Sequence, residues 1–469
     1  MSDLLESPTR GRDAAFGAAF AALVSPHAAI ALMLGAAGLL GNGIFTGLFL
    51  SGTTALVWFL TFRNDVAISA LDYMFAGFVA VVICSVLSNG ITAEPKEYVL
   101  LILTLLAYPA CRFVSAGDLT RGRDAFVGFL AIVVLAGTAV TLAGLIQEWS
   151  GFRSKPLIFG FSALPIFALQ SLSYLIFAVL MMRQVTARNT LLFSLLLIVP
   201  LATFASALVR FTFVALVAAL VVGACMSSAW RRKNVLIVIA AIALSVAAGF
   251  GSRPQHIARY VTYAIGGGQT DPDAPAPKAS EAPAASKADE APAAPQSGSA
   301  SVPVQKPEPA VKRQALAPSC TTETNVNLQN SIAIRKVLLL DAAFMLPGAG
   351  LLGYGLDAFM KVTCMTGHEM HNSVLQAFVE FGWLGGILFG ALVMTSLWSI
   401  VRAAKGDMAS RFVLCGLTFV ALLCLVHGRL SREAALFAWI GTVAGVTQSA
   451  RTRRPAAQPA EPPAKSFVT

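Results

Sequence analysis

Residues 353–386 read GYGLDAFMKVTCMTGHEMHNSVLQAFVEFGWLGG, and the expected organisation of the chain follows from this stretch. A polar, turn-rich segment containing His368, Glu369, His371 and Asn372 runs directly into an apolar helix that we expect to begin near Ser373. Polar groups at the mouth of a membrane helix are costly and usually have a function. The stretch therefore predicts a membrane helix with potential chemistry at its start.

The composition is that of a polytopic membrane protein. Of the 469 residues, 56% are hydrophobic and only 12% are charged, and the mean hydropathy is +0.72. Several apolar runs exceed the roughly 20 residues that span a bilayer core. In a soluble chain the formal net charge of +10 would suggest nucleic acid, but here the cations flank apolar runs, so no nucleic-acid partner is expected.

An all-α chain with about twelve membrane helices is expected. The apolar stretch after Arg10 and Arg12 continues past Leu40, which favours an uncleaved first helix over a signal peptide. Lys and Arg are about three times as frequent on one set of flanks as on the other, which predicts that both termini are cytoplasmic. The expected spans lie near residues 14–36, 39–62, 67–88, 97–114, 125–147, 157–182, 189–209, 211–228, 234–250, 372–400, 411–427 and 433–449.

This topology divides the chain into four parts. Residues 1–250 hold nine membrane helices, 251–371 form a large periplasmic loop between helices 9 and 10, 372–450 hold the last three helices, and 451–469 form a cytoplasmic tail. Within the loop, residues 271–318 are rich in Ala and Pro and lack aromatic residues, which predicts a disordered spacer.

The seven cysteines fall into two groups. Five lie in or at the ends of apolar spans, where cysteine acts as a small apolar filler. Cys320 and Cys364 lie in the periplasmic loop, where an oxidising compartment would permit a disulfide. Spacing alone leaves that bond open.

Two regions supply cations that are candidates for binding phosphate. Arg210 interrupts a long apolar stretch at the expected outer face, where its planar fork suits a pair of phosphate oxygens. The alternative is an Arg that extends to lipid headgroups. Arg335 and its neighbour Lys336 lie in an apolar helical segment of the loop and would add positive charge, or would simply form a solvated helix face.

Several residues of the opening stretch are candidates for acid–base or binding roles. His371 has a side chain whose ordinary pKa suits proton transfer, and His368 is an alternative base. Asn372 is a candidate for substrate binding or for an N-cap of the following helix. Glu380 lies further down the same helix and should face the bundle interior, where it would orient a polar partner or pair with Arg429 or Arg432.

The sequence lacks the motifs of nucleotide-driven or metal-dependent enzymes. It contains no P-loop or kinase motif, and the segment around Gly353 and Gly355 lacks the strand–helix context of a dinucleotide site. No cluster of carboxylates in the sequence suggests a divalent cation. We expect a reaction without a metal or another cofactor.

The order of these motifs resembles the O-antigen ligase and O-antigen polymerase superfamily of bacterial membrane glycosyltransferases. The matching pieces are Arg210, Arg335, Gly353-Tyr-Gly355, His371-Asn372 and Glu380-Phe-Gly382-Trp-Leu-Gly385. The motifs cover about residues 190–400, and the topology covers the whole chain. One departure is Val209, which stands where members of the family often carry Ser before the mid-chain Arg.

The resemblance implies a GT-C-like fold in the bacterial inner membrane and a reaction at the periplasmic face. The family transfers a glycan from undecaprenyl diphosphate to an acceptor hydroxyl, on lipid A–core for a ligase or on another lipid-linked chain for a polymerase. Mapped onto this chain, Arg210 and Arg335 would hold the diphosphate and His371 would activate or position the acceptor. The competing hypothesis is a transporter or flippase for a lipid-linked saccharide, without catalysis.

Overall fold

The computed structural model describes residues 67–115, 186–206, 210–226, 232–252, 331–365, 367–405, 408–426 and 429–452, with isolated residues between 134 and 146 and at 254 and 258. In these parts the chain is helical and contains no strand. The helices are α4 (Ala70–Asn89), α5 (Pro95–Ser115), α8 (Ala187–Ser206), α9 (Arg210–Cys225), α10 (Arg232–Gly251), α13 (Ser331–Met345), α14 (Ala358–Val362), α15 (Ser373–Ala404), α16 (Met408–Cys424) and α17 (Ala434–Thr452), with short 3-10 helices η2 (Leu346–Ala349) and η3 (Leu430–Arg432).

Helices are present at the eight spans that the sequence predicts within the described ranges, with boundaries that differ by at most four residues. The helices α4, α8, α10 and α15 are long and apolar enough to cross a membrane, and α9, α16 and α17 contain shorter apolar stretches. These features are those of a helical membrane protein. The spans expected at 14–36, 39–62 and 157–182, most of 125–147, the spacer at 271–318 and the tail after Thr452 lie outside the described residues.

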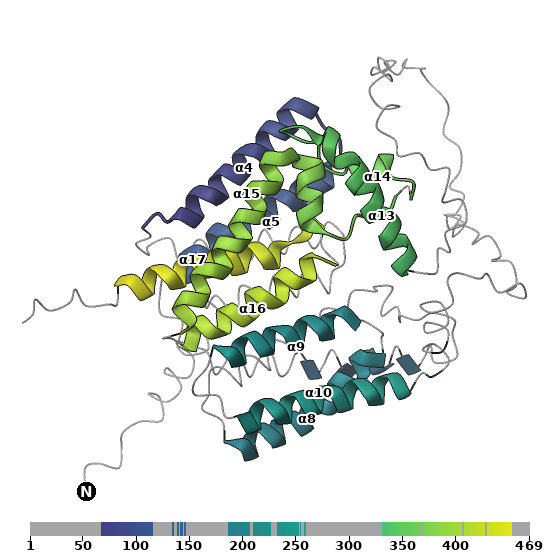
Figure 1. The fold of residues 1–469 in the computed structure, drawn as a ribbon, viewed down its shortest axis with the longest axis vertical. Helices are drawn as coiled ribbons and strands as arrows, with labels where there is room; N and C mark the ends of the chain where they lie inside the picture. The colour runs from purple at the N-terminus through teal and green to yellow at the C-terminus, as the bar shows by residue number, and fades with distance from the viewer. Residues whose placement is uncertain are drawn as a thin grey trace, which may run out of the picture.

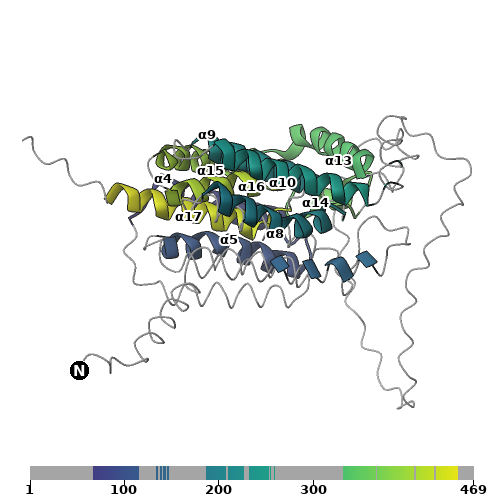
Figure 2. The same ribbon diagram turned by 90° about the horizontal axis from the view of Figure 1, so that it is seen from below.

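The helices form two groups that meet at α16 (Figure 1). In the first group α5 packs on α17, and α15 packs on α4, α16 and α17. In the second group α8 packs on α10, while α9 packs on α16 and links the two groups. Figure 2 shows the same layers from below, with α5 on one side of α17 and α16.

Glycines allow the closest of these helix contacts. A Cβ atom on Gly441 would overlap the backbone carbonyl of Tyr108, and one on Gly445 would overlap Ser115, so α17 can approach α5 only because both positions are glycine. Gly416 likewise leaves room for the ring of Trp439. Small residues at such spacing are the usual means of close packing between membrane helices.

The helix α15 is broken near its start at Gly382, which has φ 74° and ψ −174°. The nine residues of α15 before the break include the polar Ser373, Gln376 and Glu380, and those after it are largely apolar. We call the end of the bundle that holds Ser373 the His371 end, and the opposite end of α15 the Arg402 end.

A small second core lies at the His371 end. It joins Ile334, Leu338, Ala342 and Met345 of α13 to side chains of α14 and α15 and to Met370. In Figure 1, α13 and α14 lie across this end of the bundle rather than alongside the long helices. The core therefore holds the segment of the loop that contains Arg335 against the segment that contains His371.

Candidate functional site

The Gly353–Gly355 loop packs directly on the break in α15. The backbone N–H of Tyr354 donates to the Val379 carbonyl at 3.1 Å, and that of Gly355 donates to the Glu380 carbonyl at 2.9 Å. Because the helix is interrupted here, these two carbonyls would lack hydrogen-bond donors within α15. The loop supplies the donors instead. A Cβ on Gly353 would overlap the backbone of Glu380, and one on Gly382 would overlap the backbone of Gly353. The two glycine motifs thus form one structural unit.

The same loop is held on its other side by α4 and the residues after it. The Asn89 side chain donates to the Gly353 carbonyl at 3.2 Å, and the Thr92 hydroxyl donates to the Leu356 carbonyl at 2.7 Å. The Ser85 hydroxyl donates to the Glu380 carbonyl at 3.2 Å. These hydrogen bonds therefore fix the loop in position, and with it the position of Asp357, which follows the loop.

Arg429 is the centre of a buried ionic cluster beside this loop. Its side chain is 7% exposed and pairs with Asp357 at 2.7 Å and Glu369 at 2.5 Å. A carboxylate oxygen of Glu97, from α5, lies 3.3 Å away. Arg429 therefore joins three segments that are far apart in the sequence.

Arg432 extends the cluster along α5. Its guanidinium lies 2.8 Å from Glu97 and 3.6 Å from Glu369. The Ser431 hydroxyl donates to the second oxygen of Glu97 at 3.0 Å. We refer to Glu97, Asp357, Glu369, Arg429 and Arg432 together as the Arg429 cluster.

The Arg429 cluster holds three carboxylates against two guanidinium groups. Burial works against the charge of Arg429, but Glu369, Asp357 and Glu97 outweigh it and raise its pKa. Burial raises the pKa of Asp357, and Arg429 only partly offsets this. One carboxylate oxygen of Asp357, Oδ1, is buried without a hydrogen-bond partner. The Nε atoms of Arg429 and Arg432 are likewise buried without a hydrogen-bond partner. Because the carboxylates of the cluster outnumber its guanidinium groups, the cluster does not favour a further anion.

Glu380 is buried and does not form the expected ion pair. Its carboxylate accepts a hydrogen bond from the Gln376 amide at 3.0 Å, and Gln376 in turn accepts one from the Leu430 backbone N–H at 2.8 Å. Arg429 and Arg432 pair instead with the carboxylates of their own cluster. The expected pairing of Glu380 with either arginine is wrong, because the arginines reach carboxylates on α5 and in the loop before α15.

Asn372 caps α15, as one of its two sequence interpretations predicts. Its side-chain oxygen accepts the Leu375 N–H at 2.9 Å, and its backbone is extended. The next residue, Ser373, donates to the buried carboxyl of Glu433 at 2.9 Å, and the Cys424 thiol donates to the other oxygen of that carboxyl at 2.8 Å. These contacts fix the start of α15 against the last loop.

His371 adopts a left-handed backbone conformation, with φ 57°. Non-glycine residues rarely do so, and such strain often marks a functional site. Within the described residues the only other non-glycine residue with positive φ is Asp357, in the Arg429 cluster. His371 is only partly buried.

The segment before His371 is tied to α13. Asp341 accepts hydrogen bonds from the Thr363 hydroxyl at 2.5 Å and from the Cys364 N–H at 2.8 Å. Cys364 is disulfide-bonded, whereas the five cysteines of the apolar helices are free. Cys320, its expected partner, lies outside the described residues. His368 is half-buried in this segment, and its backbone N–H donates to the Met365 carbonyl at 3.0 Å.

Arg335 and Lys336 lie on α13 and point in different directions. Lys336 is exposed, and Arg335 is half-buried, where burial lowers its pKa. Because α13 shares the second core with Met370, the helix that carries Arg335 packs against the segment that leads to His371. Lys361 at the nearby end of α14 donates to the Thr92 carbonyl.

Arg210 is the first residue of α9, and its side chain is outside the described set. The main packing of α9 is on α16, whereas α13 packs on α15 and η2. The described contacts therefore hold the helix of Arg335 against the segment that carries His371, Asn372 and Glu380, and leave the place of the Arg210 side chain untested.

Sequence reasoning missed the Arg429 cluster as a unit. Arg429 and Arg432 entered only as guessed partners of Glu380, and Glu97 and Asp357 were not considered. A usable signal was that the ionisable residues of this cluster lie next to apolar helices, where each charged side chain needs a partner. Among the described residues, no group of three or more His, Cys, Asp or Glu side chains is arranged to hold a metal ion.

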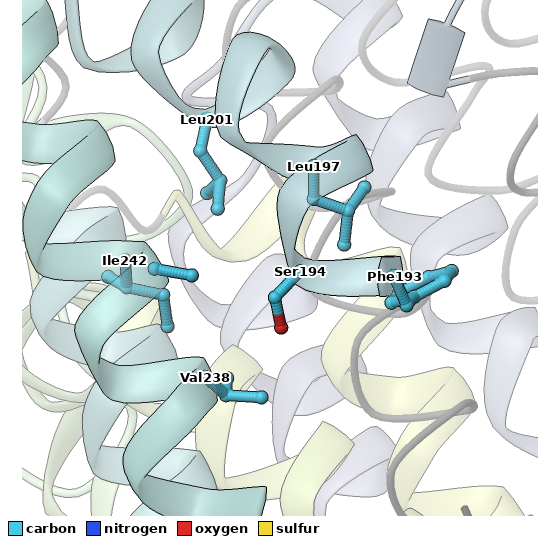
Figure 3. A pocket seen from close by; sticks show the side chains of 7 residues that line it. Phe193, Ser194, Leu197, Leu201, Val238 and Ile242 are labelled. Carbon is cyan, nitrogen blue, oxygen red and sulfur yellow. The ribbon is translucent and has the colours of Figure 1, made fainter. Parts of the chain in front are cut away.

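An apolar pocket lies apart from this site, between α8 and α10 (Figure 3). Ser194 is the only polar side chain in its lining, and no titratable group reaches it. The pocket therefore offers no acid, base or cation for chemistry.

Comparison with known proteins gives no family assignment: no protein-family model matches the chain, and no curated protein is significantly similar to it.

Proposed function

We propose that the protein is a membrane glycosyltransferase that moves a glycan from a polyprenyl-diphosphate donor to an acceptor hydroxyl, in the manner of the O-antigen ligases and polymerases that its motifs resemble. The observation that carries this proposal is the second core, which unites Arg335 on α13 with the His371 turn at one end of the bundle. The helix that carries Arg335 and the turn that carries His371 are thus packed together at the end of a membrane helix, where the head of a lipid-linked donor would lie.

The proposed reaction assigns one role to each group. The acceptor oxygen attacks the anomeric carbon of the donor glycan while the bond from that carbon to the diphosphate oxygen breaks. His371 accepts the proton of the acceptor hydroxyl, and Arg335 offsets the negative charge that gathers on the departing diphosphate. Arg210 would act with Arg335, and Lys336 and His368 are further candidates for contacts with the substrates. The glycan carbon passes through an oxocarbenium-like state.

The Arg429 cluster would serve as the scaffold of this site rather than as its anion-binding group. Its three carboxylates exceed its two guanidinium groups, so it would repel a diphosphate. It fixes Glu369, which stands two residues before His371, and Asp357, which follows the Gly353–Gly355 loop. Glu380 and Asn372 would likewise position the catalytic turn from behind.

A transporter of lipid-linked saccharide is the second candidate, and one observation favours it. Many transporters place substrates at broken helices, and α15 is broken at Gly382 beside the buried Glu380. Within the described residues, however, the break is occupied by the Gly353–Gly355 loop, which pairs the freed carbonyls. This occupation favours a fixed scaffold over a moving gate.

The test is deletion of the gene in its host, complemented with wild type or with the His371→Ala variant, followed by gel analysis of surface glycan and lipopolysaccharide. Loss of long chains from lipid A–core, with long chains persisting on the lipid carrier, would identify a ligase, which is our leading form of the proposal. Accumulation of single repeat units would identify a polymerase. An unchanged glycan profile in the deletion would contradict the proposal, and full complementation by His371→Ala would remove His371 from the reaction.

A further inference from the structure

The helix α13 is apolar on two sides, although it lies across the end of the bundle. One side forms the second core and is buried. The other side exposes Leu339 and Leu340, each 53% exposed, and Phe344, 58% exposed. A helix between a protein core and water normally shows polar residues on its outer side. The exposed face of α13 therefore suits an apolar environment.

The membrane boundary near α13 can be located from α15. At the far end of α15, the Arg402 guanidinium lies 4.7 Å from the ring centroid of Trp398, an arrangement suited to a membrane interface. The 19 residue steps back from Arg402 to Trp383 rise about 29 Å, which matches the roughly 30 Å of a bilayer core. Trp383 is partly exposed and comes directly after the break at Gly382. These features place the second boundary at the level of Trp383.

The end of η2 lies at this same level. The backbone N–H of Trp383 donates to the Gly350 carbonyl at 2.9 Å, and that of Leu384 donates to the Leu351 carbonyl at 3.3 Å. Leu351 is 65% exposed, and Leu384 and Ile387 below it on α15 are exposed as well. Exposed apolar side chains therefore lie on the outer side of α15, at Leu351 and at Phe344 near the end of α13.

We propose that α13 is an interfacial helix that lies in the headgroup–acyl boundary of the membrane, with Leu340, Phe344 and Leu351 in contact with phospholipid acyl chains. Lys336 is exposed on the same side of the helix and would extend to the headgroups, as amphipathic cations do at interfaces. Exposed apolar side chains on both α13 and the membrane helix α15 identify lipid, rather than another protein, as the occupant of this face.

The placement has a consequence for the site. Arg335 precedes Lys336 on α13, so it would lie at the depth of lipid headgroups, facing the bundle instead of the lipid. The proposal itself does not depend on glycosyl transfer, and either idea can fail while the other stands.

The experiment is site-specific photo-crosslinking of the full chain in phospholipid membranes, with p-benzoylphenylalanine in place of single residues. The test positions are Leu340 and Phe344, each replaced in turn. Ile387 on α15 is the positive control for lipid contact, and the exposed Lys361 on α14 is the negative control. Because the side chains of Leu340, Phe344 and Ile387 are exposed, these variants should retain the fold. Replacement of Lys361 removes its hydrogen bond to the Thr92 carbonyl, and size-exclusion profiles of all four variants would verify that they are folded.

We expect lipid adducts at Leu340 and Phe344 with yields similar to those at Ile387 and well above those at Lys361, as measured by mass spectrometry of the irradiated protein. Absence of lipid adducts at both positions, with adducts present at Ile387, would overturn the proposal. Adducts to protein instead of lipid at these positions would also overturn it, because they would show that a second chain covers the face.

Discussion

The bundle buries ionic groups at both ends, but it builds them differently. At the Arg402 end, Arg112 contacts Asp72 at 3.1 Å and Gln448 at 2.6 Å, and Tyr108 donates to Asp72 at 2.7 Å. These four residues come from the regular helices α4, α5 and α17, and Asp72 also completes a capping box with Ser69. We call them the Arg112 cluster. At the His371 end, the Arg429 cluster takes most of its members from loops.

The difference suggests different purposes. The Arg112 cluster balances one carboxylate with one guanidinium and ties three helices together. The Arg429 cluster carries more carboxylates than cations. It includes Asp357, one of the two left-handed non-glycine residues of the described chain, and its Glu369 stands two residues before the other, His371. Strain of that kind persists only where the surroundings enforce it and often serves a site. The first cluster therefore holds helices, whereas the second holds the loops that form the candidate active site.

The largest expected effect comes from removing the central arginine of each cluster. Arg429→Ala leaves buried carboxylates without their cation and should cost about 3–5 kcal/mol of stability. Arg112→Ala should cost less, because the Asp72 carboxylate is partly exposed and keeps its hydrogen bonds from Ser69 and Tyr108. Only Arg429→Ala should also abolish glycan transfer per folded molecule, because it releases the loop before His371. Thermal inactivation in detergent, together with an activity measurement normalised to monodisperse protein, checks both effects. Equal specific activities in the two variants would erase the distinction between the clusters.

Gly382→Ala should have the next largest effect. The new methyl group would overlap the backbone of Gly353 and Leu351, and the left-handed φ would be strained. Strain of about 1–2 kcal/mol and overpacking of about 1–3 kcal/mol together predict a severe loss of stability. Gly390→Ala is the matched control on the same helix, since nothing lies within 4 Å of its added Cβ. Similar melting temperatures for the two variants would argue against the loop–helix contact.

His371→Gly should separate stability from activity. Glycine adopts φ 57° without penalty, so the variant should gain about 1 kcal/mol of stability while it loses transfer activity. Thermal unfolding and the transfer assay on the same preparation measure both properties. A variant that keeps full activity would show that the imidazole is not used, and a destabilised variant would show that its contacts outweigh the strain.

Asp357→Asn should have the smallest effect, and that effect should depend on pH. Burial raises the pKa of Asp357, so the stability that its protonated form contributes is present at low pH and is lost as pH rises through the folded-state pKa. The variant keeps a neutral side chain, so its stability relative to wild type should increase as the pH rises above about 4, the ordinary pKa of an Asp side chain. Melting temperatures across this range test the sign. A relative stability that falls with pH would mean that the Arg429 ion pair outweighs burial.

The sequence predicted the local features of this structure well. Apolar runs gave the helices of the described part to within a few residues, and Asn372 showed its capping role by its position before α15. The Gly353–Gly355 and Gly382 motifs were visible as patterns. The direct packing of these two motifs against each other could not be predicted. A glycine in a helix can mark either a break or a close contact, and the sequence does not distinguish these two cases.

The remaining features depend on contacts between distant segments. Glu97 and Arg429 are separated by more than three hundred residues, so no local pattern could indicate that they pair. The exposure of the apolar face of α13 could not be predicted either, because its leucines fit the pattern of core residues equally well. The side chain of Arg210, the spacer and the orientation of the chain in the membrane stay predictions.

The most direct test of the central claim is the release of polyprenyl diphosphate by the purified protein in phospholipid vesicles, with a synthetic polyprenyl-diphosphate oligosaccharide as donor and an acceptor saccharide present. The account predicts release and glycan transfer by wild type and by Gly390→Ala, and neither by His371→Gly, although that variant is folded. Release by His371→Gly at the wild-type rate would contradict the account, as would a wild type that carries the intact donor across the bilayer without releasing its diphosphate.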